Sequence, residues 1–162
     1  MEELPPLYAL AFAVGTTLVM LALFRVGRRV ASPEKSVGKD FAEGNAARHL
    51  LDVGQVLGVF MVSAAAVRNC VHGKDLVADL LGAGGFGTLG LVLIAIMGRL
   101  GTALLLRSAL PKEVARGNVA AGLAAGSHYT ATGIVAAHAI AGSKLRDVGL
   151  SLLFFAIAMA AL

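Results

Sequence analysis

The chain contains one cysteine, no tryptophan and few charged residues among its 162 residues. Its single cysteine, Cys70, excludes an intramolecular disulfide framework and any metal site built from several cysteines. Charged residues make up only 15% of the sequence, whereas 57% of it is hydrophobic. Because a soluble domain of this size could not bury so much apolar surface, the composition indicates a membrane protein.

Motifs of the common enzyme classes are also missing. No phosphate-binding loop follows a strand pattern, and no serine, cysteine or metal hydrolase site is recognisable. His128 and His138 lie too far apart for one helix face, where metal ligands need a spacing of about three or four residues. We therefore expect a protein that is not an enzyme and that holds no metal ion and no cofactor. The net charge of +4 needs no nucleic acid partner, because the basic connections of membrane proteins account for it.

The sequence contains long apolar segments instead of these motifs. A helix needs about 20 apolar residues to cross a hydrocarbon core of about 30 Å. Four segments are long enough, and we expect each of them to be a transmembrane helix. They are Leu7 to Phe24, Leu50 to Val67, Leu80 to Gly98 and Val119 to Ile140. A fifth segment, Val148 to Leu162, predicts a short terminal helix or a truncated one.

One pattern occurs twice and divides the chain. Gly44 and Asn45 open the second apolar segment, and Gly117 and Asn118 open the fourth. Each copy reads as an apolar helix, a basic connection and this helix-start motif, which leads into a helix rich in glycine and alanine. The pattern predicts an all-α, polytopic helical membrane protein built as a tandem parallel repeat of two-helix hairpins. The predicted units are 1–69 for the first repeat, 70–142 for the second repeat and 143–162 for a terminal apolar helix.

The two asparagines have a simple physical role at these positions. The side-chain oxygen of Asn45 or Asn118 can accept a hydrogen bond from a free amide in the first helical turn. This matters near lipid, where such amides have few other partners. A polar contact between the two repeats is the alternative role.

These elements resemble the YjfL-type family of bacterial inner-membrane proteins, a domain of unknown function built from tandem two-helix repeats. The resemblance rests on the two asparagine-centred motifs and on the glycine-bearing helix around Gly54 and Gly58, and it covers roughly Leu7 to Gly142. It implies an inner-membrane location and an association with envelope-stress genes, and it supplies no catalytic residues. Because members of that family often have two or more repeats, it also implies that Val148 to Leu162 begins a third.

The basic residues are unevenly distributed between the connections. Ten of the fourteen Lys and Arg residues lie around the first and third connections, and four lie around the second and fourth. Since cytoplasmic connections carry the excess of Lys and Arg, we expect the first and third connections in the cytoplasm and the N-terminus outside.

Glycines at helical spacing predict where the helices pack. In lipid, helices associate by close backbone approach, which small residues permit. The third apolar segment is so dense in glycine that something must compensate its lost helix propensity, at about 1 kcal/mol per glycine. Tight packing against another helix or subunit is one explanation, and a flexible stretch lining a pathway is the other. The expected packing residues are Gly54, Gly58, Gly82, Gly85, Gly122 and Gly126.

Polar residues inside the second and fourth segments form a predicted intramembrane layer. Arg48, Asp52 and Gln55 share one helical face, and either Arg48 or His49 could neutralise Asp52. His128 takes the place of Gln55 in the second copy, which predicts a shared hydrogen-bonded layer. This layer either holds the bundle together or forms an ion or proton path, for which a histidine is a natural relay.

Two classes of function fit these patterns. We favour a non-enzymatic module that lies in the bilayer, forms a homo-oligomeric ring or cluster, and docks a cytoplasmic partner through its basic connections. These connections are roughly Arg25 to Asn45 and Arg107 to Asn118. The alternative is a channel or transport subunit that conducts ions or protons through the polar residues of the second and fourth segments.

Overall fold

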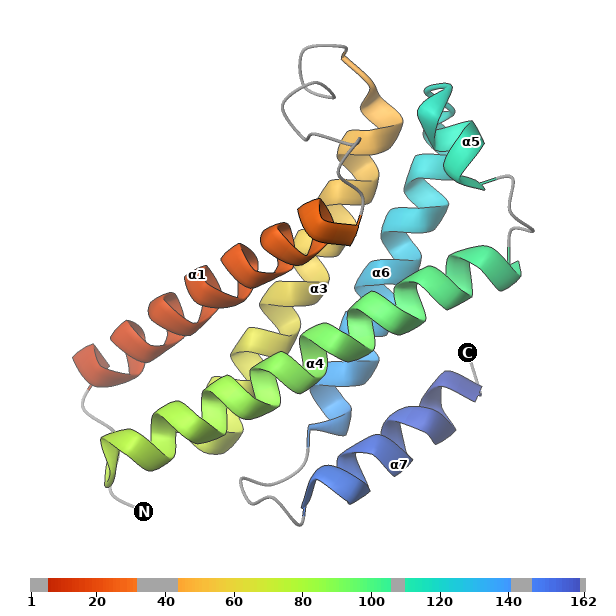
Figure 1. The fold of residues 1–162 in the computed structure, drawn as a ribbon. Coiled ribbons are helices and arrows are strands. Elements are labelled where there is room, and N and C mark those ends of the chain that lie inside the picture. The colour runs from red at the N-terminus through yellow and green to blue at the C-terminus, as the bar shows by residue number, and fades with distance from the viewer. Residues whose placement is uncertain (1–5, 32–43, 106–109, 141–146, 161–162) are drawn as a thin grey trace.

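The computed structural model describes residues 6–31, 44–105, 110–140 and 147–160, and the regular structure in these ranges is entirely helical (Figure 1). The all-α class predicted from the sequence is therefore confirmed. The helices are α1 (Pro6–Ala31), α3 (Ala46–Cys70), α4 (Leu76–Leu105), α5 (Leu110–Ala115), α6 (Val119–Ala139) and α7 (Asp147–Ala160).

Three of these helices are long and apolar enough to cross a membrane: Leu7–Val30 of α1, Ala46–Cys70 of α3 and Leu76–Leu104 of α4. The fourth predicted span coincides with α6, which has 21 residues but is not in this group. Polar residues at its centre, from Ser127 to Thr130, lower its hydropathy. The terminal segment forms the shorter apolar helix α7.

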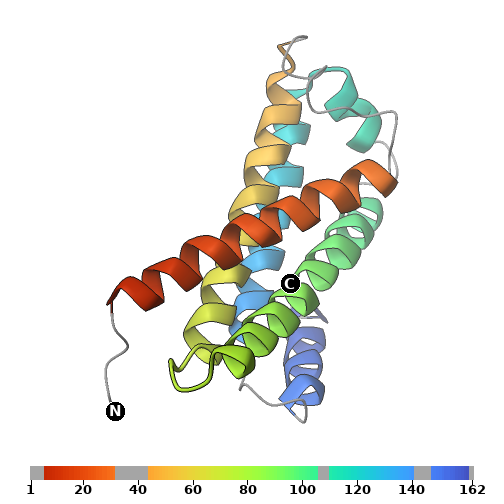
Figure 2. The same cartoon turned by 60° about the vertical axis from the view of Figure 1, so that its left-hand side comes forward.

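The centre of the molecule is the pair formed by α3 and α6, which run side by side in the same direction in both views (Figures 1 and 2). Their contact is made by backbone atoms. A Cβ atom added to Gly54 would overlap Gly126, and one added to Gly133 would overlap Gly58. A Cβ atom on Gly122 would overlap the backbone of Ala47. The regularly spaced glycines of α3 and α6 therefore pack against each other within one chain.

Helix α4 crosses this pair obliquely (Figure 2). Only some of its glycines lie in close contact with another helix. A Cβ atom on Gly82 would lie 3.0 Å from Cys70, and one on Gly87 would lie 2.8 Å from Met20 of α1. Gly85, which was predicted as a packing residue, and its neighbour Gly84 make no such contact. A Cβ atom added to either would meet no described atom of another helix within 4 Å.

The turn between α3 and α4 is held by Asp79, which is only 2% exposed. Its carboxylate accepts hydrogen bonds from the backbone amides of His72 (2.9 Å) and Gly73 (2.8 Å). The hydroxyl of Tyr8 in α1 also donates to it, at 2.9 Å. One buried carboxylate therefore shapes this turn and fastens the start of α1 to it.

Apolar side chains fill the middle of the bundle. Val59, Val62 and Ile94 are 0% exposed, and Met20 joins Val59 and Leu91 in a cluster between α1, α3 and α4.

Candidate functional site

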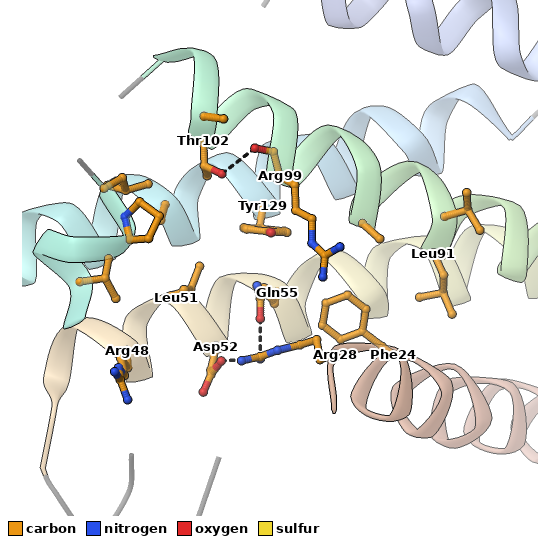
Figure 3. A pocket seen from close by; sticks show the side chains of 18 of the residues that line it. Phe24, Arg28, Arg48, Leu51, Asp52, Gln55, Leu91, Arg99, Thr102 and Tyr129 are labelled. Carbon is orange, nitrogen blue, oxygen red and sulfur yellow. Dashed lines mark hydrogen bonds and ion pairs between the residues drawn. The ribbon is translucent and has the colours of Figure 1, made fainter. Parts of the chain in front are cut away.

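A cavity of about 800 Å³ lies between α1, α3, α4, α5 and α6. Its lining includes four charged residues, Arg28, Arg48, Asp52 and Arg99 (Figure 3). Three arginines and one aspartate thus lie among the described residues of the lining. The remaining lining is mixed, with hydroxyl and amide groups beside aliphatic side chains.

Arg28 of α1 supplies the cation that neutralises Asp52. Its Nη1 atom donates to Oδ1 of Asp52 at 2.5 Å and to Oε1 of Gln55 at 2.6 Å. Asp52 and Gln55 lie three residues apart on α3, so a single guanidinium can reach both (Figure 3). All three groups are partly buried, and together they fasten the end of α1 to α3.

The sequence predicted that the cation paired with Asp52 would lie on the same helix as Asp52. In the structure this cation, Arg28, lies on α1. Arg48 or His49 was expected to neutralise Asp52, because both share its helix at helical spacing. The structure instead brings α1 across α3, and the pair joins residues 24 positions apart in the chain. Arg48 lines the cavity beside this pair.

Arg99 enters the cavity from α4, opposite the Arg28 group (Figure 3). Its backbone carbonyl accepts a hydrogen bond from Oγ1 of Thr102 at 3.0 Å. Within the described part of the chain, its guanidinium has no hydrogen-bonding or ion-pair partner. It is therefore a charge in the cavity that no described residue neutralises.

His128 lies outside the cavity lining, although a layer shared with Gln55 was expected. Its Nε2 atom lies 3.2 Å from the carbonyl oxygen of Met97, and its ring packs where Gly101 leaves room in α4. The polar α6 residue that shares the cavity with Gln55 is Tyr129, one position further along (Figure 3). Since one helical position corresponds to about 100° of rotation, this step carries the polar group to a different face.

Both helix-start motifs have the same local geometry. Gly44 (φ 63°) and Gly117 (φ 84°) adopt the left-handed conformation that glycine tolerates best. Asn45 then caps α3 by accepting from the amide of Arg48 at 3.1 Å, and Asn118 caps α6 by accepting from Ala121 at 3.3 Å.

Asn45 also makes the polar contact between the two repeats that was the alternative role predicted for it. Its Nδ2 atom donates to the carbonyl oxygen of Val114 in α5 at 3.0 Å. Val114 lines the cavity, so this bond helps to hold α5 against it.

Glu113 of α5 anchors the second motif. Its carboxylate accepts from Nδ2 of Asn118 at 3.2 Å and from Nη1 of Arg116 at 2.9 Å. The Asn118 hydrogen bond, followed by the interaction with Arg116, holds the pKa of Glu113 below its usual value.

No cluster of three or more His, Cys, Asp or Glu residues that could hold a metal ion occurs in the described ranges. The described residues that line the cavity include one carboxylate, of Asp52, and no thiol or imidazole. The polar groups of the described lining are guanidinium, hydroxyl and amide groups besides this carboxylate.

Sequence reasoning missed three residues that define the cavity: Arg28, Arg99 and Tyr129. The two arginines were interpreted only as basic residues at helix ends, which orient a membrane protein. Their charge was visible in the sequence, but their convergence depends on how α1 and α4 cross α3.

Comparison with known protein families gives one assignment. The model of the family described as Domain of Unknown Function (DUF350) matches residues 1–140 and again residues 75–162. No curated protein and no solved structure matches the chain. The two family matches together extend over the whole chain, which therefore belongs to the DUF350 family.

Proposed function

We propose that this DUF350 protein is a non-enzymatic, multi-pass protein of the bacterial inner membrane that associates with copies of itself and docks a cytoplasmic partner. The observation that carries this proposal is the open glycine pair on α4. Gly84 and Gly85 lie in a helix that could cross the membrane, and the described chain places no atom against them.

Glycine inside a helix lowers stability by about 1 kcal/mol relative to alanine, so its presence favours a site where backbones approach closely. The glycines of α3 and α6 meet this requirement inside the chain. Gly84 and Gly85 have no such close backbone contact, and Leu81 beside them is 72% exposed. A helix of a second copy packed against them would compensate their low helix propensity.

The proposed topology has two parallel hairpins, 1–69 and 70–142, followed by a terminal segment. Support comes from the matched caps at Asn45 and Asn118 and from the two overlapping family matches, the second of which begins at residue 75. The end where α3 and α6 begin would face the cytoplasm, because it carries the arginine-rich helix ends.

A cytoplasmic partner would meet the basic surface at this end. Its described part includes the exposed residues Arg29, Lys112 and Arg116. The rest of the two basic connections, residues 32–43 and 106–109, lies outside the described ranges.

The substitution Gly85→Leu tests self-association. The added side chain would block approach of a second helix, so the mass of the purified protein in nanodiscs or mild detergent should fall from that of an oligomer to that of a monomer. Gly149→Leu on α7 is the matched control, because this glycine also has no atom within 4 Å. A monomeric wild type, or an oligomer that Gly85→Leu leaves intact, would contradict the proposal.

Conduction of ions or protons is the second candidate, and the polar cavity favours it. Asp52 and Gln55 lie in this cavity, but His128 does not. The apolar packing of Val59, Val62 and Ile94 beyond them argues against an open path. In vesicles we expect no proton or cation flux; a flux that Asp52→Asn abolishes would replace the first proposal with this one.

A further inference from the structure

The cavity holds more positive charge than its own residues neutralise. Among the described lining residues Asp52 is the only carboxylate, and it is paired with Arg28, whereas the guanidinium of Arg99 has no partner among them. The side chain of Arg99 is exposed and stands beside the apolar wall of the cavity, where a guanidinium needs water or an anion as its partner. The lining therefore fits an anionic ligand.

Phosphate is the anion that suits this geometry best. A guanidinium is a planar donor that binds phosphate oxygens in pairs, and it remains charged at all physiological pH values. Additional donors are available in the same cavity, at Thr88 and Tyr129. Their hydroxyl groups can donate to oxygens that the arginines leave unsatisfied.

The size and remaining lining of the cavity indicate more than a bare ion. Its volume of about 800 Å³ is in the range of pockets that hold small molecules, about 300 to 1,000 Å³. Apolar side chains from α1, α3, α4 and α5 contribute to the wall. They include Leu23, Phe24, Leu51, Leu91, Val92 and Leu110. Such a wall can accommodate the first part of an acyl chain.

We propose that this cavity is a binding site for the phosphate group of an anionic phospholipid, with Arg99 as its anchoring residue and the lipid's acyl chain against the apolar wall. Basic pockets between membrane helices are suited to anionic headgroups. The site lies within one chain, so this inference depends on the proposed membrane location but not on self-association. A soluble phosphate ester has the same headgroup chemistry, and the experiment separates the two sources.

Binding is measured with the full chain in nanodiscs of phosphatidylcholine, to which phosphatidylglycerol is added in steps. The thermal unfolding midpoint is followed by circular dichroism, because the chain has no tryptophan to report fluorescence. We expect phosphatidylglycerol to raise the midpoint of the wild type. Arg99→Gln should weaken the apparent affinity about tenfold, the change expected when one charge-assisted donor is lost.

Arg29→Gln is the matched control, because Arg29 lies at the same end of the molecule, is exposed and is outside the lining. It should change the affinity less than twofold. Arg99→Lys, which keeps the charge, should retain part of the response and shows that a weak response in Arg99→Gln is not a folding defect.

A second series adds inorganic phosphate or glycerol 3-phosphate to nanodiscs of phosphatidylcholine alone. An Arg99-dependent stabilisation seen only in this series would overturn the lipid assignment in favour of a soluble phosphate compound. Equal midpoints in anionic and neutral lipid, or equal effects of Arg99→Gln and Arg29→Gln, would overturn the site itself.

Discussion

At the scale of single residues, the contacts that define the cavity come from side chains that reach across helices. Arg28 joins Asp52 and Gln55, and Asn45 joins α3 to Val114. Each bond satisfies a polar group that would otherwise face apolar surroundings, where an unpaired donor or acceptor is costly. These few bonds therefore fix the position of α1 and α5 around the cavity.

Arg28→Gln should lower the stability of the protein by about 1 to 3 kcal/mol, because it leaves the carboxylate of Asp52 without its partner on α1. The neighbouring substitution Arg29→Gln removes the same charge from an exposed side chain and should change stability by less than about 0.5 kcal/mol. Unfolding in a denaturing detergent, monitored by circular dichroism, measures both. Equal losses would show that the contact with Asp52 contributes nothing specific.

The sequence predicted the roles of particular residues to the extent that those roles are local. The caps at Asn45 and Asn118 follow from an asparagine directly before an apolar segment, and the structure shows both. The partner of Asp52 could not be found in this way. Helical spacing ranks only neighbours on the same helix, whereas Arg28 reaches Asp52 because of the crossing of α1 over α3.

At the scale of helices, the parallel pair of α3 and α6 is held together by direct backbone contact. Its glycines let the two backbones touch, and Oγ1 of Thr130 in α6 donates to the carbonyl oxygen of Gly54 in α3 at 3.3 Å. Their spacing by four residues was visible in the sequence, and it predicted close packing. The sequence did not show which helix these glycines pack against, because a small-residue face fits a helix of the same chain as well as one of a second copy.

Gly126→Ala tests this element. The added Cβ would overlap the carbonyl oxygen of Leu50, which belongs to the backbone and cannot move aside cheaply, so stability should fall by about 1 to 3 kcal/mol. Gly149→Ala on α7 adds the same atom in open space and should stabilise the protein by up to about 1 kcal/mol through helix propensity. A neutral Gly126→Ala would mean that the two helices are not in backbone contact.

At the scale of the whole molecule, the helix ends divide into two groups. The ends of α1 and α4 and the starts of α3 and α6 lie towards one end, and the turn held by Asp79 lies at the other (Figure 1). The alternation of apolar segments and connections was enough to predict this arrangement. The lower hydropathy of α6 was also visible in the sequence, but the polar residues from Ser127 to Thr130 were treated as part of a span.

Cysteine labelling tests the proposed orientation. In a Cys70→Ala background, Arg29→Cys and Arg116→Cys should react with a membrane-impermeant reagent only from the cytoplasmic side, because both exposed positions lie at the arginine-rich end. Lys74→Cys, in the turn between α3 and α4, should react only from the outside. Labelling of Arg29→Cys and Arg116→Cys from opposite sides would rule out two parallel hairpins.

The parallel course of α3 and α6 has an electrostatic consequence. Each helix has a macrodipole equivalent to about half a positive charge at its N-terminus, and both N-termini lie at the end that holds the three arginines. The asparagines that cap them are uncharged, so they satisfy amides without offsetting this field. The C-terminal ends of α1 and α4 lie at the same end and carry about half a negative charge each, so the backbone dipoles nearly cancel over the end as a whole. Only an anion placed directly at the starts of α3 and α6 gains from the field of the backbone.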